Sequence, residues 1–250
     1  MRSIAIVSGK GGVGKTTTSI NLGASLNDLG KNVIIVDANI ATPDIGLSLG
    51  APVVPIALQH VLSGKNDAEH AIYVHSSGTK ILPSALSYSE PYSLENLKEV
   101  VSRLKELSEL VIIDTPAGTG EDVRAVITAA DECLIVTNPE MPALSSALKT
   151  IKIAEELGKT VLGVVLTKTK GRKEMSTKNV ESFLGQKVIG KIQQDDNVSQ
   201  AVLDKEPLAI AYPKSKASKG YKELARRIAG DESLGSFDKV KTFIADLMNR

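Results

Sequence analysis

The chain has 250 residues, of which 42% are hydrophobic and 24% charged, so it fits one large folded domain and excludes disordered, collagen-like and coiled-coil classes. Thirty basic against 29 acidic residues give a formal net charge of +1, which provides no overall attraction to nucleic acid or anionic lipid. Cys133 is the only cysteine, which excludes disulfide frameworks, paired-cysteine zinc sites and thiolate-bound iron–sulfur clusters. With no apolar stretch long enough for a signal sequence or a membrane span, a reducing, cytoplasmic location is expected.

Short β-branched runs alternate with segments of helical period along the chain, and this alternation predicts a mostly parallel sheet covered by helices. Aromatic residues make up only 3%, so the core must be aliphatic, as in buried parallel strands. Residues 50–93 are irregular and rich in Pro, Gly and Ser, and are interpreted as surface connections up to Ser93, the expected cap of a helix. Strands are predicted at residues 3–8, 32–36, 110–113, 133–137, 161–167 and 188–192, and helices at residues 16–29, 94–107, 142–157 and 197–203.

A glycine-rich loop follows the first predicted strand. Residues 9–17 read Gly-Lys-Gly-Gly-Val-Gly-Lys-Thr-Thr, which fits G-x-x-x-x-G-K-[ST] between a strand and a helix. The glycines allow successive N–H groups to face an anion, and the positive end of the helix faces the same point. Lys15 is expected to neutralise phosphates and Thr16 to bind Mg²⁺. Together with the alternation of strands and helices, this motif predicts an α/β fold, a three-layer P-loop NTPase. The expected phosphate-binding residues are Gly11, Gly12, Val13, Gly14, Lys15, Thr16 and Thr17.

Two other predicted strands end in carboxylates. Asp114 ends one of them and begins Asp-Thr-Pro-Ala-Gly, the place where a Mg²⁺-nucleotide site needs its second carboxylate, and the Gly118 amide is placed to sense the γ-phosphate. Asp37 follows residues 32–36 at the carboxyl edge of the sheet, where open α/β sheets bind ligands. The predicted metal site therefore consists of Thr16, Asp37 and Asp114.

The second lysine of the loop, Lys10, is not required by P-loops in general, and here the sequence resembles the deviant Walker A motif of the MinD/ParA superfamily, in particular archaeal-type MinD homologues. Residues 36–50 and 111–118 look like its two switch regions, followed by Thr-Asn-Pro-Glu at residues 137–140. The resemblance covers most of the chain. It implies an ATPase that forms a homodimer with Mg-ATP bound and separates after hydrolysis, acting as a switch that positions cellular machinery such as the division site.

The same resemblance implies the roles of individual residues. Lys10 would reach the nucleotide of the partner subunit in the dimer. The residues expected to take part in catalysis are Lys10, Lys15, Asp37, Asn39 and Asp114. Those expected beside the purine are Thr167, Lys168, Gln193, Gln194 and Asp195, so that ATP, rather than another nucleotide, is implied by the family alone.

The sequence departs from bacterial MinD at two places. Asn39 stands where the first switch resembles a second aspartate, and because an amide is not a base, it predicts slow hydrolysis unless Asp44 or a partner protein completes the site. Residues 141–146 read Met-Pro-Ala-Leu-Ser-Ser in place of a Ser-Val-Arg-Asp stretch. This argues against the bacterial partners MinC and MinE and leaves the protein partner or activator unknown.

Two alternative functions stay open: a ParA-like ATPase that binds DNA without sequence specificity, and a nucleotide-dependent interaction module that does not hydrolyse. Basic clusters are more often solvated faces than phosphate contacts at this net charge, so specific nucleic-acid binding is not expected. His60, His70 and His75 lack metal-ligand spacing and are predicted on the surface, with Cys133 buried. The two basic clusters are Lys168, Lys170, Arg172, Lys173 and Lys178, and Lys214, Lys216, Lys219, Lys222, Arg226 and Arg227.

The predicted organisation is an ATPase domain over residues 1–230 and a linker with a C-terminal amphipathic helix over residues 231–250. The helix resembles the membrane-binding tail of bacterial MinD, which suggests peripheral contact with the inner face of the cell membrane through residues 237–248. Its charged residues sum to +1 and do not favour anionic lipid, so docking on its own domain or on a partner is the alternative. The apolar residues at helical spacing are Phe237, Val240, Phe243, Ile244, Leu247 and Met248.

Overall fold

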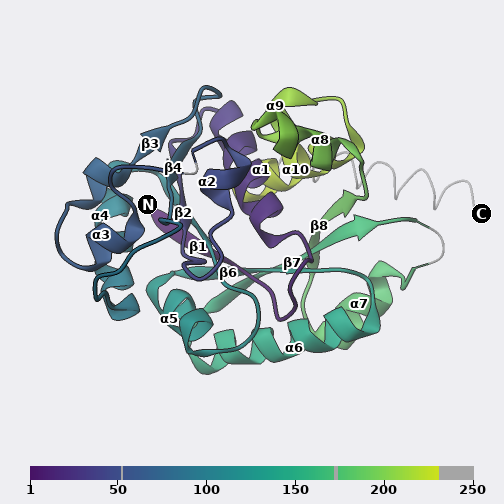
Figure 1. The fold of residues 1–250 in the computed structure, drawn as a ribbon. Helices are drawn as coiled ribbons and strands as arrows, with labels where there is room; N and C mark the ends of the chain where they lie inside the picture. The colour runs from purple at the N-terminus through teal and green to yellow at the C-terminus, as the bar shows by residue number, and fades with distance from the viewer. Residues whose placement is uncertain (52, 172–173, 231–250) are drawn as a thin grey trace, which may run out of the picture.

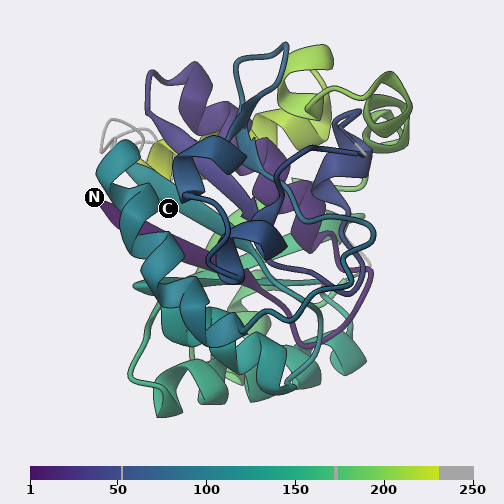
Figure 2. The same ribbon diagram turned by 60° about the vertical axis from the view of Figure 1, so that its left-hand side comes forward.

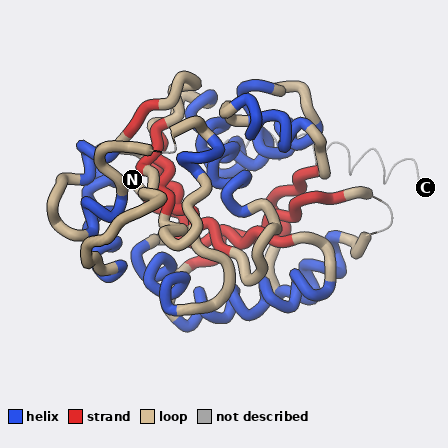
Figure 3. Tube along the Cα trace, in the orientation of Figure 1, coloured by secondary structure: helices blue, strands red, loops and turns tan. Residues whose placement is uncertain are grey.

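The computed structural model describes residues 1–51, 53–171 and 174–230. Within these residues, eight strands form one sheet in the order β3-β4-β2-β5-β1-β6-β7-β8, and only the β3–β4 pair is antiparallel (Figures 1 and 3). The strands are β1 Arg2–Val7, β2 Val33–Asp37, β3 Tyr73–Val74, β4 Lys80–Leu82, β5 Leu110–Asp114, β6 Glu132–Thr137, β7 Thr160–Thr169 and β8 Val188–Gln193. The helices are α1 Lys15–Asp28, α2 Ile45–Ser48, α3 Leu58–Leu62, α4 Leu97–Leu107, α5 Glu121–Ala129, α6 Met141–Glu156, α7 Thr177–Leu184, α8 Asn197–Asp204, α9 Leu208–Ala211 and α10 Lys216–Ile228, with 3₁₀ helices Ala68–Ala71 and Leu94–Asn96.

Helices cover both faces of the sheet and make three layers (Figures 1 and 2). The central strand β1 is buried on both sides, because successive residues of a strand point to opposite faces. Ala5 and Val7 join the core under α4, α5, α6 and α7, whereas Ile4 and Ile6 join the core under α1, α9 and α10. The predicted three-layer fold with a mostly parallel sheet is confirmed.

The interpretation of residues 50–93 as surface connections is wrong. This segment contains α3, β3 and β4, and Leu58, Leu62 and Leu82 are fully buried. The strand β4 extends the sheet by pairing parallel to β2, with Ile35 opposite Ile81. A strand of three residues is too short to show an apolar period, which is why the turn-rich composition concealed it.

Two of the three histidines are also placed differently from the prediction. His70 is exposed, but His60 is partly buried and its Nδ1 accepts a hydrogen bond from the Ala57 amide at 3.1 Å. His75 is partly buried too, with its ring 3.0 Å from the Lys205 carbonyl. In both rings a backbone group takes the place of water as hydrogen-bond partner. That group is near in sequence for His60 and distant for His75. Cys133 is buried as predicted, and burial raises the pKa of its thiol to about 12.

The predicted tail, residues 231–250, lies outside the described residues, as do Arg172 and Lys173 of the first basic cluster. Across the described ranges, none of the helices has the length and apolar character needed to cross a bilayer. The last described helix, α10, packs against α1 and β8 and ends at Ile228.

Candidate nucleotide-binding site

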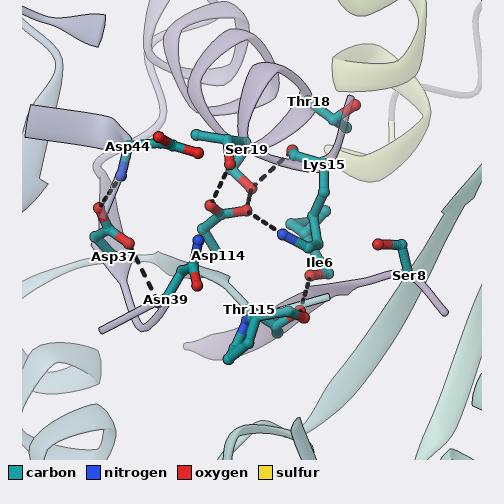
Figure 4. Close-up of polar contacts among 12 residues, drawn as sticks. Ile6, Ser8, Lys15, Thr18, Ser19, Asp37, Asn39, Asp44, Asp114 and Thr115 are labelled. Carbon is teal, nitrogen blue, oxygen red and sulfur yellow. Dashed lines mark hydrogen bonds and ion pairs between the residues drawn. The ribbon is translucent and has the colours of Figure 1, made fainter. Parts of the chain in front are cut away.

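Three neighbouring strands end at the same edge of the sheet and bring the predicted site together. Because β5 lies between β1 and β2 in parallel register, Asp114 pairs with Ile6 on one side and with Asp37 on the other. The chain leaves β1 through the glycine-rich loop and enters α1 at Lys15. Figure 4 shows the two carboxylates beneath the first turns of α1.

The glycine-rich loop presents unpaired amide groups. Gly12 and Gly14 have φ of 74° and 89°, the left-handed region that favours glycine, and Gly14 is the N-cap of α1. In the part of the chain that the structure describes, no backbone N–H of residues 11–14 donates a hydrogen bond. The first turn of α1 adds further unpaired N–H groups. Together they form a cradle for an anion at a helix N-terminus.

Gly9, at the start of the loop, serves packing instead. A Cβ at this position would lie 2.3 Å from the backbone carbonyl oxygen of Ser146 in α6, so close that the loop or the helix would have to shift. The loop is therefore held directly against α6. Sequence reasoning assigned Gly9 to the motif without this contact.

Asp114 is the buried centre of a polar cluster. Its Oδ2 accepts a hydrogen bond from Thr16 Oγ1 at 2.7 Å, and its Oδ1 accepts one from Ser19 Oγ at 2.8 Å. Lys15 Nζ lies 3.8 Å from Oδ1. Burial raises the pKa of Asp114, while Lys15 and the two hydroxyls oppose this rise. Ser19 was missed by sequence reasoning, although its position three residues after Thr16 on a helix was a usable signal.

Asp37 organises the loop that follows β2. Its Oδ1 accepts from the Asn39 amide at 3.2 Å, and its Oδ2 accepts from the amides of Asp44 and Ile45 at 3.1 and 3.0 Å. Burial raises the pKa of Asp37 to about 8, and the neighbouring Asp114 carboxylate contributes to the rise. Both oxygens are thus engaged by backbone in this structure, and the predicted role of Asp37 as a metal ligand stays a prediction.

Asn39 and Asp44 differ in their freedom. Asn39 Nδ2 donates to the Thr42 carbonyl at 2.6 Å and Asn39 Oδ1 accepts from Thr42 Oγ1 at 3.1 Å, so both ends of the side-chain amide are tied locally. Asp44 lines the cavity, and Figure 4 shows its carboxylate directed toward α1. Of the two, Asp44 is the one that offers a carboxylate to a ligand.

A cavity of about 600 Å³ opens above the loop and gathers most of the predicted site. Three of the predicted residues are also held by contacts within the protein. The Gly118 amide donates to the Ser8 carbonyl at 3.0 Å, and the side chain of Val13 in the loop is buried. The Asp195 carboxylate accepts from the Ala217 amide at 3.1 Å and so caps α10. The predicted residues that line the cavity are Lys10, Gly11, Gly12, Gly14, Lys15, Thr16, Thr17, Asn39, Thr167, Lys168, Gln193, Gln194 and Asp195.

Tyr221 also lines this cavity, and no sequence signal indicated it. It comes from α10, is 2% exposed, and its hydroxyl lies 3.5 Å from Thr18 Oγ1 of α1. Burial raises the pKa of the Tyr221 hydroxyl to about 12. The side chain therefore contributes a neutral wall that joins α10 to α1.

The oxygen donors at the cradle fit Mg²⁺, which is commonly held by one or two protein oxygens, water and substrate phosphates. The Thr16 hydroxyl and the Asp114 carboxylate lie next to each other at the end of the loop. Among the residues that the structure describes, no group of three or more His, Cys, Asp or Glu side chains is arranged to hold a metal. A cation here would depend on the phosphates of the ligand for most of its coordination.

This mostly parallel fold, with an amide cradle between β1 and α1 and a carboxylate on the adjacent strand, is that of the P-loop NTPases. A ParA family model, described as "NUBPL iron-transfer P-loop NTPase", matches residues 1–229, and the chain belongs to this family. It is 37% identical over 242 residues to an uncharacterized ATP-binding protein of Methanocaldococcus jannaschii, covering 96% of this chain and 92% of the relative. It is 32% identical over 261 residues to the septum site-determining protein MinD of Bacillus subtilis, covering 96% and 97%.

Solved structures agree with these relatives. The cell division ATPase MinD of Pyrococcus furiosus matches with a TM-score of 0.87 and 31% identity, covering 92% of this chain and 98% of that chain. The septum site-determining protein MinD of Pyrococcus horikoshii, complexed with Mg-ADP, matches with a TM-score of 0.87 and 29% identity, covering 93% and 98%. The predicted membership of the MinD/ParA superfamily is confirmed.

Proposed function

We propose that this chain is an ATPase switch that binds Mg-ATP, forms a homodimer in the ATP-bound state and hydrolyses ATP slowly. The observation that carries the proposal is the cradle of unpaired amides at residues 11–14, with Lys15 and the Thr16–Asp114 pair beside it. The relative from Pyrococcus horikoshii, which was solved with Mg-ADP, supports the choice of ligand.

The chemistry at the cradle is electrostatic. Lys15 neutralises the phosphates, and the loop amides hold their oxygens without reorganisation. Thr16 Oγ1 and Asp114 would hold Mg²⁺, which when bound supplies positive charge to the phosphate oxygens. Asp44 is the carboxylate placed to orient a water or accept its proton, because Asn39 is tied to Thr42.

Lys10 supports the dimer. Its side chain is exposed at the mouth of the cavity, and among the described residues it makes no hydrogen bond or ion pair. An unpaired ammonium beside an anion site is available to the phosphates of a second copy. In this proposal Lys15 serves the nucleotide of its own subunit and Lys10 that of the partner.

The process served by the switch is proposed by relationship. A septum site-determining protein of Bacillus subtilis is among the relatives, and positioning of the division site or similar machinery follows from it. We propose a cytoplasmic protein with a protein activator other than MinC and MinE. Residues 237–248 are proposed as its contact with a partner or its own domain, with peripheral membrane contact as the alternative. The family description names iron transfer, but this sequence has no paired cysteines to bind iron, since Cys133 is its single cysteine and is buried. We therefore do not propose iron transfer for this chain.

The oligomeric state tests the proposal. We expect light scattering on a sizing column to show a dimer with Mg-ATP and a monomer with Mg-ADP or without nucleotide. Lys10→Ala should bind ATP as a monomer and fail to dimerise, whereas Lys98→Ala, which removes an exposed lysine on α4, should behave as the wild type. A dimer that ignores the nucleotide, or that survives Lys10→Ala unchanged, would contradict the proposed switch.

A further inference from the structure

Two consecutive residues at the end of β7 hold two consecutive carbonyls of the glycine-rich loop. Thr167 Oγ1 donates to the Val13 carbonyl at 2.5 Å, and Lys168 Nζ donates to the Gly12 carbonyl at 2.7 Å. The threonine is buried, whereas the lysine is exposed on the wall of the cavity. Strand β7, two strands away from β1 in the sheet, thus reaches back to the loop.

Holding a carbonyl also fixes an amide. A peptide bond is planar and trans, so the C=O of one residue and the N–H of the next point in opposite directions within one rigid unit. With the Gly12 carbonyl held by Lys168, the Val13 N–H is turned the other way. The Thr167 contact does the same for the Gly14 N–H. Neither N–H donates to any group in the described part of the chain, so both are left for an anion.

Of the two side chains, Lys168 makes the firmer contact, because its bond to the Gly12 carbonyl does not compete with other acceptors for a single proton. The Thr167 hydroxyl has one proton and lies within reach of two further acceptors, the Thr137 carbonyl at 3.2 Å and Asn138 Oδ1 at 3.1 Å. The Lys168 ammonium carries three protons. Its backbone has φ of 52°, a conformation that is unfavourable for a residue other than glycine and that marks a position with a reason to be kept.

We propose that Lys168 is a positioning residue that orients the Gly12–Val13 peptide so that the Val13 N–H faces the phosphates before they bind. This inference rests on the proposed nucleotide function. It assigns Lys168 to the phosphate end of the ligand, and not to the purine beside which the family resemblance placed it. The two roles differ in what they do to a ligand that has no base.

Inorganic tripolyphosphate separates the two roles. Titration calorimetry with Mg-ATP and with Mg-tripolyphosphate should show about tenfold weaker binding of both ligands by Lys168→Met, because a charge-assisted hydrogen bond is lost. Lys168→Arg, which keeps a charged donor, should regain most of the affinity for both. Weaker binding of ATP alone would show that Lys168 reads the base and would overturn the inference.

Two control variants test whether the loss belongs to the Lys168 side chain itself. Lys170→Met removes the same charge two residues away, from an exposed side chain outside this cavity, and should change neither affinity. Equal losses in Lys168→Met and Lys170→Met would show a general charge effect and overturn the inference. Lys168→Gly relieves the backbone conformation, so its thermal unfolding midpoint should not fall although its affinity does. Unchanged affinity in Lys168→Gly would also overturn it, whereas a wild-type chain that binds neither ligand would overturn the proposed function itself.

Discussion

Thr16 Oγ1, in the first turn of α1 where the glycine-rich loop ends, donates a hydrogen bond to Asp114 Oδ2 over 2.7 Å. This bond joins the start of α1 to the end of β5. The other oxygen of Asp114 is engaged by Ser19, and Lys15 lies beside it. The buried carboxylate therefore holds in place the hydroxyl that would bind Mg²⁺ and the ammonium that would meet the phosphates. Removing the charge of Asp114 should therefore weaken metal-dependent hydrolysis more than it destabilises the fold.

Asp114→Asn keeps the size of the side chain and removes its charge. We expect single-turnover ATP hydrolysis in saturating Mg²⁺ to fall by roughly a hundredfold, as for partners that orient a metal site. Nucleotide binding without metal should stay near the wild-type level. Asp122→Asn, which changes an exposed carboxylate on α5, is the control and should hydrolyse as the wild type. An unchanged Mg²⁺ dependence in Asp114→Asn would show that the metal lies elsewhere.

Gly9→Ala tests the contact between the loop and α6. The added methyl would meet the Ser146 carbonyl at 2.3 Å, so we expect the free energy of unfolding to fall by about 2 kcal/mol, the cost of forced overpacking. Gly11→Ala is the matched comparison, because its Cβ would find only the Ala117 Cβ at 4.0 Å, and it should change stability by less than about 0.5 kcal/mol. Urea unfolding measures both. Similar values for the two variants would show that the loop moves freely away from α6.

Asp37 predicts a pH dependence of stability. Its pKa is raised from 3.8 to about 8 in the folded chain, so between these values the folded state keeps a proton that the unfolded state has lost. The free energy of unfolding should therefore be highest below the unfolded pKa and decrease as pH rises through the folded pKa, by up to about 1.4 kcal/mol per pH unit from this group. Urea unfolding between about pH 5 and about pH 8 measures the slope.

Asp37→Asn should flatten that slope, because the side chain no longer ionises. Asp122→Asn removes an exposed carboxylate and should keep the wild-type slope. Identical slopes in the wild type and in Asp37→Asn would mean that Asp37 is ionised in the folded protein throughout this range.

Asp44 and Asn39 give opposite expectations for hydrolysis. Asp44→Asn should slow single-turnover hydrolysis by at least about tenfold, because the loop would lose its only cavity-facing carboxylate, with ATP binding little changed. Asn39→Asp should give no gain, because the substitution breaks the bond to the Thr42 carbonyl and adds a charge at a position only 7% exposed. Faster hydrolysis in Asn39→Asp, with no loss in Asp44→Asn, would assign the role to position 39 instead.

Sequence reasoning predicted the site to the extent that its signals are local. The loop at residues 9–17, with a strand before it and a helix after it, is complete within one stretch of chain, and Asp37 and Asp114 could be placed because each ends an apolar run. That Thr16 and Asp114 share one site was predicted, although they lie 98 residues apart. The amides that bind Asp37, up to eight residues away, and the Ser19 hydroxyl that binds Asp114 could not be predicted, because neither pairing has a period or motif.

The sequence by itself determined the alternation of strands and helices, the aliphatic core and the anion-binding loop, because periodicity and motif spacing are properties of neighbouring residues. The tertiary structure alone decided which strands are neighbours, and with that order it brought Lys168 to Gly12 across 156 residues and Tyr221 to Thr18 across 203. It also placed the short strand β4 beside β2. The first contact arises from the strand order β1-β6-β7 and the second from the packing of α10 against α1. Both arrangements are selected by packing over the whole chain and are not written in any local segment.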